Sequence, residues 1–181
     1  MHKSLAKLFL NLSEMTGENQ LLHDQVYKVA VDCSLTLVQM AQRGQFQNVD
    51  EFLDDAIKGS GLIIEGVGQY DALIHLVRFN TDLVDNDDAD WFLQKKNLRV
   101  ARIEEILALG SQFPDVQRKM RIAGRARSSF GEDPNDPFYT TVYLDCVEGN
   151  RTVEVEHLDA TVRAVSGHPT VEYFWACVPI K

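Results

Sequence analysis

The residues best suited to chemistry in this chain are the arginines of its one strongly basic segment. Residues 114–131 hold one acid and five Lys or Arg side chains, a net charge of +4 in a chain of net charge −9. On a helix, Arg118, Arg121 and Arg125 would share one side, and Arg127 ends the segment. Because a guanidinium fork suits phosphate and carboxylate groups, these four arginines predict a binding site for an anionic ligand or partner. The alternative is that they are solvated or pair with this protein's own acids.

A second candidate is an acidic segment before Trp91. Its members are Asp82, Asp85, Asp87, Asp88 and Asp90. Counted from Asp85, an EF-hand loop would need glycine at the sixth position and glutamate at the twelfth. Asp90 and Lys96 stand there instead. The segment therefore predicts no metal site, but an acidic surface that a basic partner would contact.

Catalytic signatures are weak throughout the sequence. The five histidines lack metal-ligand spacing, and no G-x-S-x-G nucleophile elbow occurs. We therefore predict no catalytic residue, no metal and no cofactor. The alternative that stays open is a small enzyme with its site between helices and sheet, where Glu154, Glu156, His157 and Arg163 would be the first residues to test.

The elements that would position these residues change character near residue 130. Up to Arg127, apolar residues recur at helical spacing; the clearest stripe, which contains Leu22, Val26 and Val29, predicts a helix from Asn19 to Gln42. Further helices are predicted at residues 5–12, 49–57, 62–79, 98–109 and 114–127, and from Trp91.

After Pro137 the pattern alternates with the period of a strand, as in Thr140, Val142 and Leu144. A phase slip near His157 and a final apolar run at residues 171–180 predict further strands. The fold class predicted is α+β: a bundle of about six or seven helices, then a three- or four-stranded antiparallel β-meander. The predicted domains are a helical region (1–130), a turn-rich linker (131–137) and a sheet (138–181), which could share one core with the helices.

Composition limits the function classes. A net charge of −9 disfavours general nucleic-acid binding and permits binding to a basic protein surface. No apolar run approaches the roughly 20 residues that a membrane span needs. Cys33, Cys146 and Cys177 have no disulfide or zinc spacing, which predicts reduced thiols in the cytoplasm.

These observations together predict a non-enzymatic, acidic protein-binding or regulatory protein with a basic protein partner. One specific form is an inhibitor of a nucleic-acid-handling complex. Besides the enzyme, nucleic-acid binding through residues 114–127 remains an alternative; it would show steep salt dependence.

Overall fold

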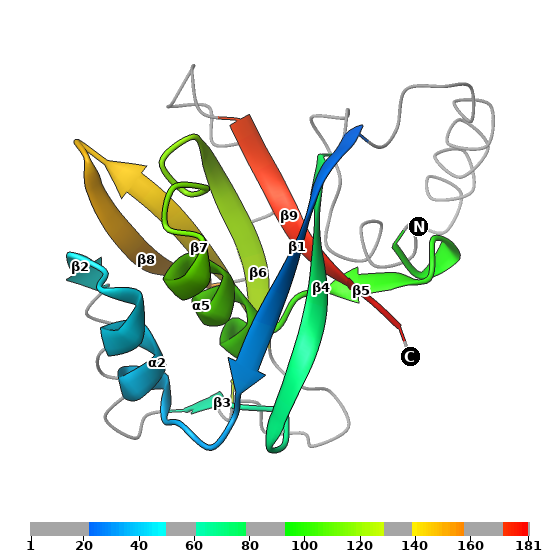
Figure 1. Ribbon diagram of the computed structural model, residues 1–181, viewed down its shortest axis with the longest axis horizontal. Helices are drawn as coiled ribbons and strands as arrows, with labels where there is room; N and C mark the ends of the chain where they lie inside the picture. Colours follow the sequence, from blue (N-terminus) through cyan, green and yellow to red (C-terminus); the bar gives the residue numbers. More distant parts are fainter. Residues whose placement is uncertain (1–21, 50–60, 79–92, 129–138, 158–171, 181) are drawn as a thin grey trace, which may run out of the picture.

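The computed structural model describes residues 22–49, 61–78, 93–128, 139–157 and 172–180. These ranges form mainly β-structure (Figure 1). The elements are β1 (Leu22–Asp32), α2 (Leu37–Gly44), β2 (Asn48–Val49), β3 (Leu62–Ile63), β4 (Gln69–Arg78), β5 (Leu98–Val100), α5 (Ile103–Gln112), β6 (Met120–Ser128), β7 (Tyr139–Val147), β8 (Asn150–His157) and β9 (Glu172–Pro179).

The predicted α+β fold with a helical bundle is wrong, and β1 shows why. Leu22, Val26 and Val29 fit helical spacing, but the same stretch also alternates. Val29 and Val31 are buried in the core, whereas Val26 is half exposed. Since β-branched residues favour strands, the alternation prevails and the predicted helix from Asn19 to Gln42 is replaced by β1 and the short helix α2.

The same correction applies to two more predicted helices. Residues 69–78 of the segment 62–79 form β4, and the basic segment 114–127 is a turn followed by β6. The helix predicted at 98–109 is displaced, because residues 98–100 form β5 and α5 begins at Ile103. The helices predicted at 5–12 and 49–57 lie outside the described residues, apart from Val49 in β2, and so does Trp91.

The nine strands of the described residues belong to one sheet with the main order β1-β4-β9-β6-β7-β8-β2, where β3 pairs with β6 and β5 with β9. Of the strands predicted after Pro137, those at β7, β8 and β9 are present, whereas residues 158–171 lie outside the described residues. The three strands do not form a meander. β9 inserts between β4 and β6 and runs parallel to β6. Both faces of β9 are buried: Phe174 and Ala176 lie in one apolar cluster, Trp175 and Cys177 in another. A strand covered on both faces suits a central position.

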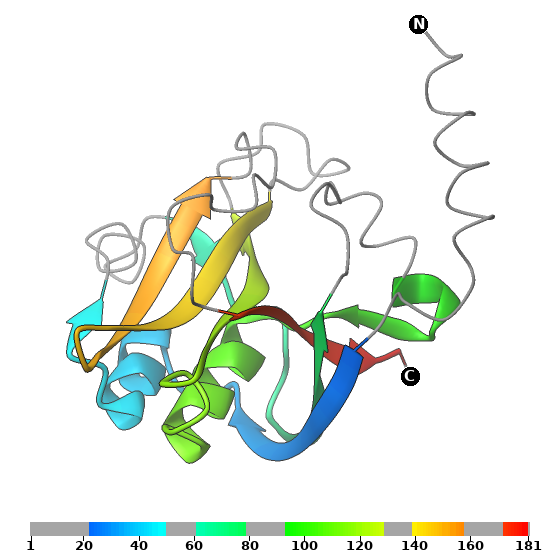
Figure 2. The ribbon, with the colours of Figure 1, turned by 90° about the horizontal axis from the view of Figure 1, so that it is seen from above.

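The sheet curls around α5, and α2 lies beside that helix (Figures 1 and 2). Ile103, Ile106 and Leu107 of α5 are fully buried against the sheet. The closest approach is at Gly124 of β6, where an added Cβ would lie 2.3 Å from Ile106 Cγ1. Glycine at this position therefore allows α5 to sit directly on the centre of the sheet.

A buried arginine holds the carboxyl-terminal ends of both helices. Arg151 of β8 donates from Nη1 to the Gly44 carbonyl of α2 at 2.7 Å and from Nη2 to the Gly110 carbonyl of α5. Its Nη2 also reaches Gln117 Oε1 at 3.2 Å, and its guanidinium lies 4.9 Å from the centre of the Phe46 ring. A cation at two helix C-termini satisfies carbonyls that have no partner within the helix and complements the helix dipoles.

Candidate functional site

The predicted arginine stripe is divided by the structure. Arg118 lies in the turn before β6 and pairs with Asp115 at 3.6 Å, with both side chains largely exposed. Arg121, Arg125 and Arg127 lie on β6, spaced so that a strand presents them on one face. The four therefore do not form one helical surface, although three of them still share a face.

Arg121 is engaged by the protein's own acids. Its Nη2 lies 2.7 Å from Glu154 Oε2, its Nε lies 3.4 Å from Asp145 Oδ2, and its guanidinium lies 4.0 Å from the centre of the Tyr143 ring. The Arg125 guanidinium lies similarly above the Tyr139 ring, at 5.1 Å. Arg121 therefore pairs with the protein's own acids, which was the alternative interpretation of the basic segment.

The other predicted positions are only partly placed. Glu156 and His157 belong to β8, and Glu154 is occupied by Arg121. Arg163 and the five aspartates lie outside the described residues; these are Asp82, Asp85, Asp87, Asp88 and Asp90. In the ranges that the structure does cover, no group of three His, Cys, Asp or Glu side chains has the geometry to hold a metal ion.

Two buried carboxylates at the start of α5, Glu104 and Glu105, were not predicted from the sequence. Glu105 accepts two hydrogen bonds from Arg99, at 2.6 and 2.8 Å, and one from the Arg102 backbone N–H at 2.8 Å. Tyr70 donates its hydroxyl to the same carboxylate at 3.2 Å. Burial and the nearby Glu105 and Glu104 charges raise the pKa of Tyr70. Glu105 is thus a fully bonded ion-pair centre that joins β4, β5 and α5.

Glu104 is less well satisfied. It is fully buried and its Oε1 accepts the Gly66 backbone N–H at 2.9 Å, but its Oε2 has no hydrogen-bond partner. Burial raises the pKa of Glu104, and the neighbouring Glu105 charge raises it further. This carboxyl therefore retains its proton to a higher pH than an exposed glutamate. No sequence signal marks it, because Glu104 lies in a first helical turn, where exposed acids are ordinary.

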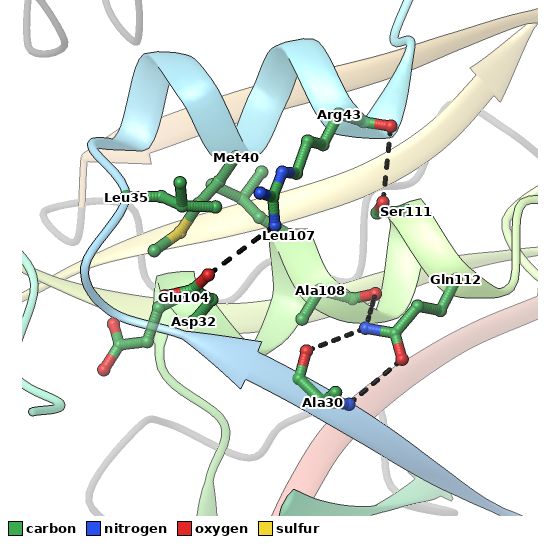
Figure 3. A pocket seen from close by; sticks show the side chains of 10 residues that line it. All are labelled: Ala30, Asp32, Leu35, Met40, Arg43, Glu104, Leu107, Ala108, Ser111 and Gln112. Atoms are coloured by element: carbon green, nitrogen blue, oxygen red, sulfur yellow. Dashed lines mark hydrogen bonds and ion pairs between the residues drawn. The ribbon is translucent and has the colours of Figure 1, made fainter. Parts of the chain in front are cut away.

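An open hollow lies between α2, α5 and the end of β1 (Figure 3). Its empty space is about 330 Å³ with the open solvent at its mouth included, and its lining contains Asp32, Arg43 and Glu104. Arg43 Nη1 reaches Asp32 Oδ2 at 3.7 Å. Hydrogen bonding from Ser34 lowers the pKa of Asp32. The hollow has a mixed lining, because Leu35, Met40 and Leu107 stand beside these polar groups, and the Glu104 side chain is fully buried.

The feature with the clearest capacity for binding is the outer edge of β1. Among the described residues, β1 is the terminal strand of the sheet, and ten of its eleven residues pair in register with β4 on one side only. The backbone groups of Ala30 point away from β4, because both bond to the Gln112 side chain. Since the direction alternates along a strand, the N–H and C=O groups of Val26 and Lys28 also point outward. Among the described residues, Gln112 alone bonds to this edge.

Exposed apolar side chains lie beside the outward backbone groups of the edge. Val26 is 49% exposed and Leu73 of β4 is 48% exposed. Val26 pairs in register with His75, and Lys28 pairs with Leu73, so these side chains lie next to one another on the outward face. Lys28 Nζ and Asp71 Oδ2 form an exposed pair at 2.6 Å, which leaves this part of the face close to neutral. The alternation of residues 26–31 is the sequence signal that could have identified this strand.

The chain's wider relationships do not identify it further. Comparison with protein-family models, curated proteins and solved structures finds no match. Within the described ranges, none of the helices combines the length and apolar character needed to cross a membrane.

Proposed function

We propose that this protein is an acidic binding or regulatory protein that holds a partner protein along the outer edge of β1. The observation that carries the proposal is the outward backbone of Val26 and Lys28 on a long terminal strand, where no strand of the described residues pairs with these outward groups. Exposed edges of this kind accept an extended segment of another chain by backbone hydrogen bonding. The exposed Val26 and Leu73 side chains beside the edge add apolar surface that a bound segment would cover.

The partner we propose has a basic surface. The chain carries a net charge of −9, and opposite charge speeds the encounter of two proteins more than it sets their final affinity. A nucleic-acid-handling complex is one kind of target with such a surface, and inhibition of it is the narrower form of the proposal. Cys33, Cys146 and Cys177 are thiols that form no disulfide, which supports a cytoplasmic location, where cysteines stay reduced.

The test begins with capture of partners on the immobilised full chain at low and high salt. Each captured protein is identified, purified and titrated against wild type, Val26→Pro and Val26→Thr. Proline at Val26 removes an outward N–H and leaves the ladder to β4 intact. Threonine keeps both the N–H and the β-branched shape, so it is the matched control.

We expect Val26→Pro to weaken binding about tenfold or more, because a lost hydrogen bond costs about 0.5–1.5 kcal/mol and the ring also meets the partner strand. Val26→Thr should bind within about threefold of wild type, which is well under 1 kcal/mol. Circular dichroism and urea unfolding serve to check that both variants are folded. A purified partner that binds all three proteins equally would refute the proposed surface, as would the absence of any partner at either ionic strength.

A further inference from the structure

Gln112 behaves as a short substitute for a neighbouring strand. Its Oε1 accepts the Ala30 N–H at 3.0 Å, and its Nε2 donates to the Ala30 carbonyl at 2.9 Å. The same Nε2 contacts the Ala108 carbonyl of α5 at 3.3 Å, which ties the amide to its own helix. The Gln112 side chain thus satisfies both outward backbone groups of one residue of the β1 edge, as a paired strand would.

The residue after Gln112 reinforces this position. The Phe113 ring meets the Tyr27 ring edge-to-face, with their centres 4.9 Å apart. Tyr27 lies on the core side of β1, two residues before Val29. The carboxyl-terminal end of α5 therefore stands against the β1 edge at Ala30. In the part of the chain that the structure describes, no backbone group pairs with the edge at Val26 and Lys28.

We propose that Gln112 fixes where a partner segment ends on β1, so that the site takes a short extended segment paired with Val26 and Lys28 and stopped at Ala30. This inference rests on the proposed function and adds the length and pattern of the segment. An added strand alternates its side chains between the two faces of the sheet. One face presents Val26, and the other presents the Tyr27–Phe113 ring pair. The segment that fits carries apolar side chains toward both.

The probe is a nine-residue peptide enriched from a random phage-displayed library on the full chain, synthesised with a fluorescent label. Its affinity is measured by anisotropy for wild type, Val26→Pro, Gln112→Ala and Gln94→Ala. Gln94 is an exposed glutamine of the described chain, so its variant is the matched control for loss of an amide. Amide hydrogen exchange is followed at single residues with and without the peptide.

In wild type, we expect the peptide to slow exchange at Val26 and Lys28 at least about tenfold and to leave Ala30 unchanged, because Ala30 is already bonded. In free Gln112→Ala, exchange at Ala30 should accelerate about tenfold or more. Adding the peptide should then protect Ala30 as well. Gln94→Ala should behave as wild type.

Three results would overturn the inference. If Ala30 gains protection equally in wild type, or never gains it in Gln112→Ala, Gln112 does not set the end of the segment; the proposed function survives when Val26→Pro still abolishes binding. If no enriched peptide loses affinity in Val26→Pro, the proposed surface itself fails. If ultracentrifugation shows a dimer that Val26→Pro dissociates, the edge is occupied by a second copy of this chain and not by a partner segment.

Discussion

Replacing Arg151 by methionine should destabilise the protein more than a typical single substitution. Arg151 is buried, and its guanidinium bonds to the carbonyls of Gly44 and Gly110 at the ends of two helices. Methionine has a similar length without donors, so it fills most of the space and leaves both carbonyls without this partner. Burial disfavours the charged guanidinium and lowers the pKa of Arg151, so methionine would also remove a desolvation penalty.

The magnitude follows from these opposing contributions. Hydrogen bonds to a charged group contribute about 1.5–3 kcal/mol each, so the two carbonyl bonds together contribute about 3–6 kcal/mol. Removing the buried charge also removes its desolvation penalty, which offsets part of the lost hydrogen-bond energy. We expect a net loss of about 3 kcal/mol in the free energy of unfolding. Domains of this size unfold with about 5–15 kcal/mol, so the variant should still fold.

Urea unfolding followed by circular dichroism measures this loss. Arg151→Lys keeps the charge but offers one ammonium in place of a planar fork, so it should lose less than the methionine variant. Arg118→Met, at an exposed ion pair, is the control and should change stability by less than about 0.5 kcal/mol. A loss below about 1 kcal/mol for Arg151→Met would refute the role assigned to this arginine.

Two further substitutions test the interior. The pKa of Glu104 is raised above its ordinary value of 4.5 by burial, so its contribution to stability is complete below that pH and is lost as the pH rises through the folded-state pKa. Glu104→Gln should therefore gain stability relative to wild type at pH 8 and much less at pH 5, and a constant difference in urea unfolding would contradict this. Gly124→Ala should cost about 1–3 kcal/mol through overpacking against Ile106. Ile106→Ala removes both Cγ1 and Cδ1, so in the thermal midpoint it should cost less in the Gly124→Ala background than in wild type. Two independent losses would argue against the contact.

The strands β1 and β6 show why the fold could be predicted only in part from the sequence. Both segments carry apolar residues at spacings that suit a helix and also alternate with the period of a strand. β4, which pairs with β1, and β9, which pairs with β6, lie far away in the sequence. Local spacing alone cannot weigh such contacts, because strand formation depends on burial by distant neighbours. The strands after Pro137 were predictable, since turn residues and alternation agree there.

The candidate site was predictable only in its residue types. The arginines of the basic segment were identified, but their partners were not: Arg121 of β6 meets Glu154 of β8 across the intervening strand β7. The buried state of Glu104 and the bonding of Gln112 to Ala30 also depend on long-range packing. What the sequence does contain is the outward series of Val26, Lys28 and Ala30, which indicates an edge strand once the strand itself is recognised.

Exchange rates of the Val26 and Lys28 backbone amides, measured with and without the purified partner, test the central claim most directly. Saturation with the partner should slow both amides about tenfold or more and leave amides on the far strand β8 unchanged. Protection confined to other strands, with Val26 and Lys28 exchanging as fast as in the free protein, would contradict binding along the β1 edge.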